Sequence, residues 1–115
     1  ESKIMAHTRL TLMDLTDQSD AVTGSTFTIY PDHTNSVRNF SNAFSGVCTF
    51  DISDSTATVQ LQGSIDGTNF VDVKEVSRVG SDILEGYSVT IFPFMRAKVS
   101  AAGTNTNIKV MVAYT

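Results

Sequence analysis

Between residues 57 and 75 the chain alternates apolar and polar side chains around a tight-turn motif. Val59, Leu61 and Ile65 fall on one face of an extended strand, and the polar residues between them fall on the other. An Asp-Gly pair follows at 66–67, where a hairpin turn needs residues that tolerate positive φ, and a second β-rich run follows the turn. The pattern therefore predicts a half-buried antiparallel hairpin.

The same alternation recurs along the rest of the chain in short segments. Gly, Asn, Asp and Ser separate these segments at intervals of about 8–12 residues, which is typical of sandwiches and small barrels. The sequence therefore predicts a single all-β domain over residues 1–115, an antiparallel β-sandwich of jelly-roll or immunoglobulin type with eight or nine short strands. Besides the hairpin, we expect strands at residues 8–15, 26–30, 47–52, 87–92, 95–101 and 107–114.

Three other segments are less regular. Residues 14–24 form a polar, acidic connection with few core candidates. Residues 36–44 have apolar spacings that allow a short helical turn. Residues 82–86 can form one turn of helix before the next strand. Pro93 cannot donate a ladder hydrogen bond, so it marks a bend, a bulge or an edge.

The first 22 residues are the least core-like part of the chain. They form either an extended arm that docks on a neighbouring molecule or an ordinary first strand. An arm would expose apolar side chains that become buried on docking. The candidate contact residues of this segment are Ile4, Met5, Leu10, Leu12 and Met13.

A second candidate contact lies around Pro93. Phe92 and Phe94 flank this proline, so at least one of them must face away from the side of Val89 and Ile91. An exposed phenylalanine here would be an inter-subunit contact. The alternative is a second buried layer within the sandwich.

Composition narrows the classes of function. Charged residues make up 17% of the chain, fifteen threonines and thirteen serines favour strands, and the net charge is −4. An acidic chain without a basic patch is not expected to bind nucleic acid. No run of about 18 apolar residues exists to span a membrane, and the polar start lacks the apolar core of a signal peptide. Cys48, the only cysteine, is expected to be a buried structural thiol.

Residues for catalysis or metal binding are few. His7 and His33 are the only histidines, and no Gly-x-Ser-x-Gly elbow occurs, so we expect no enzyme and no cofactor. Zinc-ligand spacing is absent. Residues 51–54 and 66–69 offer oxygens for calcium, but turn chemistry explains both segments.

Two segments together resemble a known class of protein. The first is Gln-Gly-Ser-Ile-Asp-Gly-Thr-Asn-Phe-Val-Asp-Val at residues 62–73. The second is Tyr-Ser-Val-Thr-Ile-Phe-Pro-Phe-Met-Arg-Ala-Lys-Val at residues 87–99, followed by a Gly-Thr-Asn loop and a final Val-rich strand. This layout resembles small β-sandwich virion proteins of tailed bacteriophages, including capsid decoration (cement) proteins and head or tail fibre modules. The resemblance covers residues 57–115.

The resemblance implies a non-enzymatic structural role in the virion, after assembly in the host cytoplasm. We expect a capsid decoration protein that binds the major capsid protein, or another virion protein, and stabilises the head. We also expect a homo-oligomer, with a trimer as the working stoichiometry. The alternative is a carbohydrate-binding module, which would present Tyr30, Tyr87 and Phe94 together on one concave face.

Overall fold

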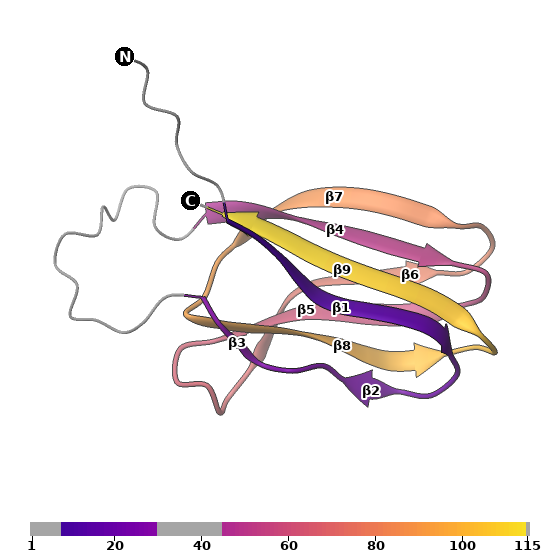
Figure 1. Cartoon of the computed structure of the whole chain (residues 1–115), viewed down its shortest axis with the longest axis horizontal. Helices are drawn as coiled ribbons and strands as arrows, with labels where there is room; N and C mark the ends of the chain where they lie inside the picture. Colours follow the sequence, from indigo (N-terminus) through magenta and orange to yellow (C-terminus); the bar gives the residue numbers. More distant parts are fainter. Residues whose placement is uncertain (1–7, 30–44, 115) are drawn as a thin grey trace, which may run out of the picture.

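A computed structural model describes residues 8–29 and 45–114, and this part of the chain contains strands but no helix. Figure 1 shows the strands as two layers that lie face to face. The strands are β1 (Thr8–Gln18), β2 (Val22–Thr23), β3 (Phe27–Thr28), β4 (Ser45–Ser53), β5 (Ala57–Ser64), β6 (Val71–Arg78), β7 (Ile83–Thr90), β8 (Phe94–Ala102) and β9 (Thr106–Tyr114).

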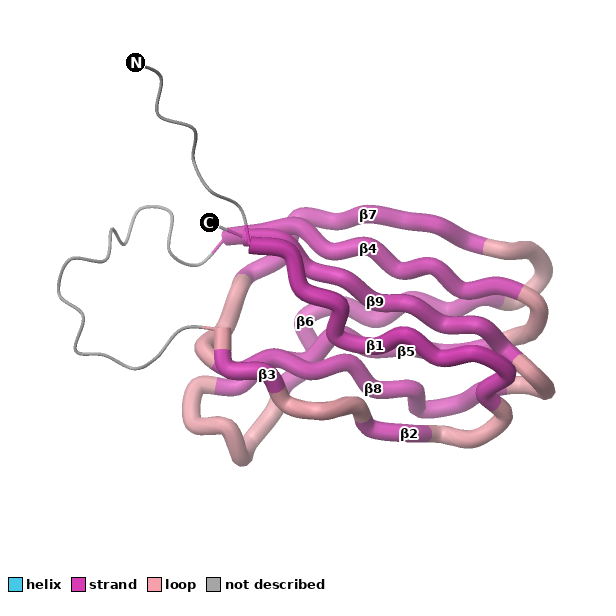
Figure 2. Tube along the Cα trace, in the orientation of Figure 1, coloured by secondary structure: helices cyan, strands magenta, loops and turns pink. Residues whose placement is uncertain are grey.

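The two layers are antiparallel sheets. Sheet A has the order β1-β9-β4-β7, and sheet B has the order β2-β8-β5-β6, with β3 also paired to β8. The chain crosses from one sheet to the other at every connection except β2–β3 and β5–β6, as the tube in Figure 2 also shows. The fold is therefore a β-sandwich, and its strand order is that of a jelly roll rather than an immunoglobulin domain.

The core lies between the sheets and follows the predicted alternation. In β9, Ile108, Val110 and Val112 are buried, while Lys109 between them is exposed. Phe50 on β4 is fully buried and faces the other sheet. The strands forecast at 47–52, 95–101 and 107–114 are confirmed, each within a few residues, as β4, β8 and β9.

The expectations for 14–24 and 82–86 were wrong. β1 continues to Gln18 along β9, and Val22 then begins the short strand β2 against β8. Residues 83–86 belong to β7 rather than to a helical turn, because they pair with β4 without interruption. Ile65 is also not a core residue, since it lies beyond the end of β5 and is 77% exposed. The helical turn considered for 36–44 lies outside the described residues.

Candidate interaction surface

The outer face of sheet A carries an apolar hollow across its two central strands. Ala113 on β9 pairs with Val47 on β4, and Met111 pairs with Thr49 in the next row. These rows leave a cavity of about 240 Å³, and Val47 is 51% exposed at its wall. The hollow is lined by Arg9, Val47, Cys48, Thr49, Met111, Val112 and Ala113.

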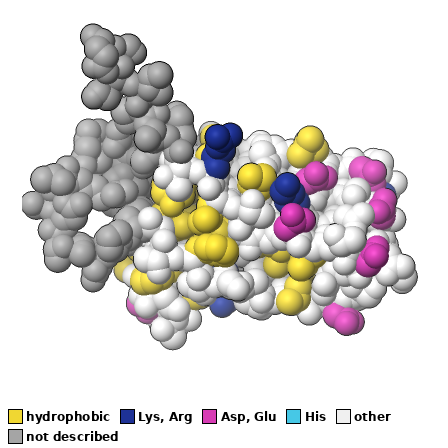
Figure 3. Space-filling view, viewed as in Figure 1, with side chains coloured by type: hydrophobic (Ala, Val, Ile, Leu, Met, Phe, Trp, Pro, Cys, Tyr) yellow, Lys and Arg dark blue, Asp and Glu magenta, His cyan; other side chains and the backbone are white. Residues whose placement is uncertain are grey.

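Charged groups lie further along the same face. Lys109 on β9 lies in register between Asp14 on β1 and Asp51 on β4. Figure 3 looks onto this face and shows hydrophobic side chains gathered towards one end of the sheet and acidic ones towards the other. The hollow lies in the more apolar part of this face, with Arg9 at its rim, and this part is the one suited to exclude water.

The outer face of sheet B, in contrast, is occupied by its own polar network. Arg96 Nε donates to Gln62 Oε1 at 2.8 Å, and Gln62 Nε2 donates to Asp72 Oδ1 at 2.8 Å. The Arg96 guanidinium also lies 3.8 Å from the centre of the Phe70 ring. Gln62 is only 7% exposed, so these groups satisfy one another and close this part of the face.

The turn between β5 and β6 explains why Asp66 resembled a calcium ligand. Asp66 Oδ1 accepts the backbone N–H groups of Thr68 and Asn69, each at 2.8 Å, and the Ser64 hydroxyl at 2.9 Å. The backbone N–H groups of Asn69 and Thr68 hold the pKa of Asp66 well below its ordinary value. Gly67 supplies the positive φ of 82° that the turn requires. This carboxylate is a structural acceptor within the turn.

At the β6–β7 edge of the sandwich, a lysine points inward. Lys74 pairs with the buried Leu61, and its Nζ lies 4.1 Å from the centre of the Tyr87 ring. The Tyr87 hydroxyl donates to Glu85 Oε1, and this bond raises the tyrosine pKa.

Cys48 lies opposite Tyr87 and is 1% exposed, which confirms the prediction of a buried thiol. Burial raises the pKa of Cys48 to about 11, so the thiol is not a nucleophile at neutral pH.

The residues predicted as an N-terminal contact surface are not together on the surface. Leu12 and Met13 are core residues, 4% and 6% exposed, and Leu10 packs against that core. They belong to β1, which is hydrogen-bonded to β9, so the first-strand alternative describes residues 8–18. Ile4 and Met5 lie outside the described residues.

The two phenylalanines beside Pro93 are separated by the sheet. Phe92 packs against the core over Gly63, where an added Cβ would meet its ring at 2.4 Å. Phe94 lies on the outer side of β8 and packs against Gly67 of the β5–β6 turn. Both rings are partly buried within their own chain. Phe92 therefore agrees with the alternative of a buried layer, and neither ring is a fully exposed contact residue.

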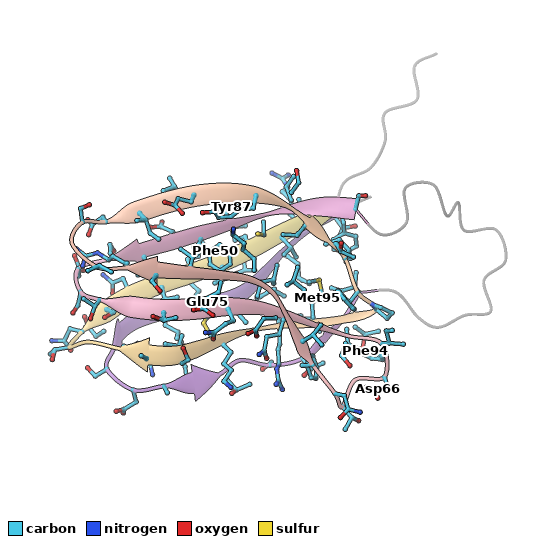
Figure 4. The ribbon with its side chains drawn as sticks, turned by 180° about the vertical axis from the view of Figure 1, so that it is seen from behind. Phe50, Asp66, Glu75, Tyr87, Phe94 and Met95 are labelled. Atoms are coloured by element: carbon cyan, nitrogen blue, oxygen red, sulfur yellow. The ribbon has the colours of Figure 1, made fainter. Side chains whose placement is uncertain are left out.

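Two of the three aromatic residues expected to cluster in a carbohydrate-binding module, Tyr87 and Phe94, lie on different sheets. Tyr87 lies on sheet A near Phe50, with a ring-centre distance of 6.2 Å, whereas Phe94 lies at the far end of sheet B beside Asp66 (Figure 4). Tyr30, His7 and His33 lie outside the described residues. Among the described residues, no group of three or more His, Cys, Asp or Glu side chains could hold a metal ion.

Sequence inspection missed the apolar hollow, although the signal was present. Met111 and Ala113 are apolar residues on the otherwise polar side of the last strand, and Val47 lies on the side of β4 that Thr49 and Asp51 also occupy. Three apolar residues out of phase with the core pattern were the available sign. These residues come together only through the β4–β9 register, which cannot be read from the sequence.

Comparison with known proteins supplies no relative for this fold. No family model matches the chain, and neither a curated protein nor a solved structure matches it. In the part of the chain that the structure describes, there is no helix long and apolar enough to cross a membrane.

Proposed function

We propose that this chain is a non-enzymatic virion structural protein, most plainly a capsid decoration protein that binds the coat-protein lattice through the outer face of sheet A. The observation that carries the proposal is the apolar hollow beside Val47. When a partner's side chain displaces water from an open apolar cavity on a sheet face, the free energy of the complex is lowered. The resemblance of residues 57–115 to phage β-sandwich proteins supports the choice of partner.

The character of the surface around the hollow fits association by shape rather than by charge. Only 17% of the residues are charged, and on sheet B the Arg96, Gln62 and Asp72 side chains are hydrogen-bonded to one another. An apolar side chain from a coat subunit would fill the hollow, and the polar side chains of Arg9 and Thr49 at its rim would fix the orientation. Binding that holds adjacent coat subunits together would stabilise the shell by mass action.

A charge placed in the hollow tests the proposal. Val47→Asp puts a carboxylate where the partner's side chain would be desolvated, and Val47 is already 51% exposed, so the fold can accept it. Val79→Asp is the matched control, because Val79 is 78% exposed in the β6–β7 turn. The measurement is co-sedimentation with tailed-phage heads from which this protein has been removed. We expect Val47→Asp to weaken binding by about tenfold or more, and Val79→Asp to bind like the wild type.

Two outcomes would overturn the proposal. One is binding of Val47→Asp at wild-type affinity, which would place the contact elsewhere. The other is saturable binding to a glycan array with no affinity for heads, which would establish the carbohydrate-binding alternative instead.

A further inference from the structure

Most edges of this sandwich are built so that another strand cannot add to them. β1 shifts register twice against β9, and β6 shifts register against β5 beside Val73. β2 and β3 are two residues each, so that edge of sheet B is broken. Bulges, short strands and inward-pointing charges such as Lys74 are the devices that protect sheet edges from pairing.

The edge formed by β7 is long and has no bulge. Its one core-side charge, Glu85, lies in register with Phe50 and accepts the Tyr87 hydroxyl of its own chain. Ile83–Thr90 pairs with β4 over eight consecutive residues without a register shift. It contains no proline, and no described strand lies on its other side, where Figures 1 and 4 both show a free margin of sheet A. A regular edge presents a row of backbone N–H and C=O groups, and the partner that satisfies such a row is another extended backbone.

We propose that two copies of the chain associate by antiparallel pairing of β7 with β7 of the second copy, so that two four-stranded A sheets become one continuous sheet. A two-fold axis makes such an edge its own complement. The β7 edge borders the hollow, because Ser88 pairs with Val47 at the wall of the hollow. The inference does not depend on the proposed function, since pairing of two copies requires no coat protein.

The charges on β7 select the register of this pairing. Residues directly opposite each other in an antiparallel pair lie on the same face of the sheet. The two-fold axis therefore passes midway between the two copies of one residue, and naming that residue defines the register. An axis through Glu85 would oppose two carboxylates, which is unfavourable. An axis through Gly86 instead places Glu85 opposite Tyr87 of the second copy. That ring carries the Lys74 ammonium at 4.1 Å, so each carboxylate meets a cation.

The outer face of β7 is complementary in the same register. Leu84 is 73% exposed in the single chain, and the axis through Gly86 places it opposite Ser88 of the second copy. Ser88 is small and pairs with Val47, which is 51% exposed. Leu84 can therefore lie over Ser88 against Val47, which removes apolar surface of both copies from water.

Sedimentation velocity over a range of protein concentrations tests the association. The expected result is a reversible monomer–dimer equilibrium. Glu85→Lys should raise the dissociation constant by about tenfold or more, because it places two cations together at each end of the pair. Glu75→Lys is the matched control, since Glu75 is exposed on the outer face of β6, and it should leave the constant unchanged. A monomer at every concentration, or a stable trimer, would overturn the inference.

Disulfide cross-linking tests the register itself. Gly86 has room for a side chain, because an added Cβ meets its nearest atoms at 3.5 and 3.7 Å. Opposite residues in an antiparallel pair have Cα atoms about 4.5–5.5 Å apart, which a disulfide can bridge. Under mild oxidation Gly86→Cys should form a covalent dimer, whereas Val79→Cys, in an exposed turn, should not. A dimer in which Gly86→Cys stays reduced would show that the copies meet through another surface.

Discussion

Gly63 shows how a single absent side chain shapes the end of the sandwich. It lies on the inner side of β5, and the Phe92 ring occupies the space where a Cβ would be, with the nearest ring atom at 2.4 Å from that point. Phe92 packs against the core there after the chain leaves β7. The glycine is thus required by close packing, not by an unusual φ.

We therefore expect Gly63→Ala to destabilise the protein by about 1–3 kcal/mol, because the new methyl group forces the ring out of its position. Urea denaturation measures the loss. Gly80→Ala is the control, since nothing lies within 4 Å of an added Cβ there, and its effect should stay within about 0.5 kcal/mol. Phe92→Leu, combined with Gly63→Ala, should recover part of the loss. Equal midpoints for the two alanine variants would contradict this account of the packing.

Asp66 gives the turn a dependence on pH. Its folded-state pKa lies below the ordinary value of about 3.9, because the N–H groups of Asn69 and Thr68 favour the charged form. The carboxylate therefore stabilises the fold fully above that ordinary value. Its contribution is lost as the pH falls below about 4 towards the folded-state pKa.

The comparison with Asp66→Asn isolates this effect, since asparagine keeps a neutral oxygen acceptor in the turn. The wild type should have the higher urea midpoint near pH 7, and the difference should shrink as the pH falls below about 4. Urea titrations across this range, followed by circular dichroism, supply the measurement. A difference that stays constant down to about pH 2 would show that the charge of Asp66 contributes nothing.

At the scale of the strands, the sequence predicts those strands in which apolar and polar residues simply alternate. β8 and β9 follow it, because one side of each faces the core and the other faces solvent. β1 departs from it, because a register shift between Thr11 and Met13 buries two adjacent residues, Leu12 and Met13. A bulge removes the period of two on which the prediction depends, so the sequence leaves a docking arm and a first strand as alternatives for these side chains.

The remaining strand errors arise from partners distant in sequence. β1 continues through polar residues to Gln18 because β9 lies beside it, and Asn107 Oδ1 accepts the Asp17 backbone N–H at 3.0 Å. Residues 83–86 are extended for the same reason, since β4 supplies their ladder. The residues around each segment give no sign of its partner strand. Pairing with that partner outweighs the local preference for a loop or a helical turn.

The candidate interaction surface was the least predictable feature. Val47, Met111 and Ala113 lie on β4 and β9, which are far apart in the sequence, and only the β4–β9 register brings them together. Each is unremarkable alone, because single exposed apolar residues are common. Sequence can flag apolar residues that are out of phase with the core, but it does not show that they converge.

For the molecule as a whole, the order of strands in space leaves no part able to fold alone. β9 is the last strand of the chain, yet it lies between β1 and β4 in the middle of sheet A. It also contributes Ile108, Val110 and Val112, each at most 2% exposed, to the core that both sheets share. Neither sheet can complete its buried face before the C-terminal strand is in place.

We therefore expect one cooperative unfolding transition. Two of the three tyrosines, Tyr87 and Tyr114, belong to sheet A, so the fluorescence of a Tyr30→Phe variant reports on that sheet, whereas far-ultraviolet circular dichroism reports on both sheets. The two probes should give the same urea midpoint and the same slope. Because nearly all strand pairs join distant segments, refolding after dilution should take milliseconds to seconds rather than microseconds. A fluorescence transition at lower urea than the dichroism transition would show that sheet A opens first, and that the two sheets do not form one folding unit.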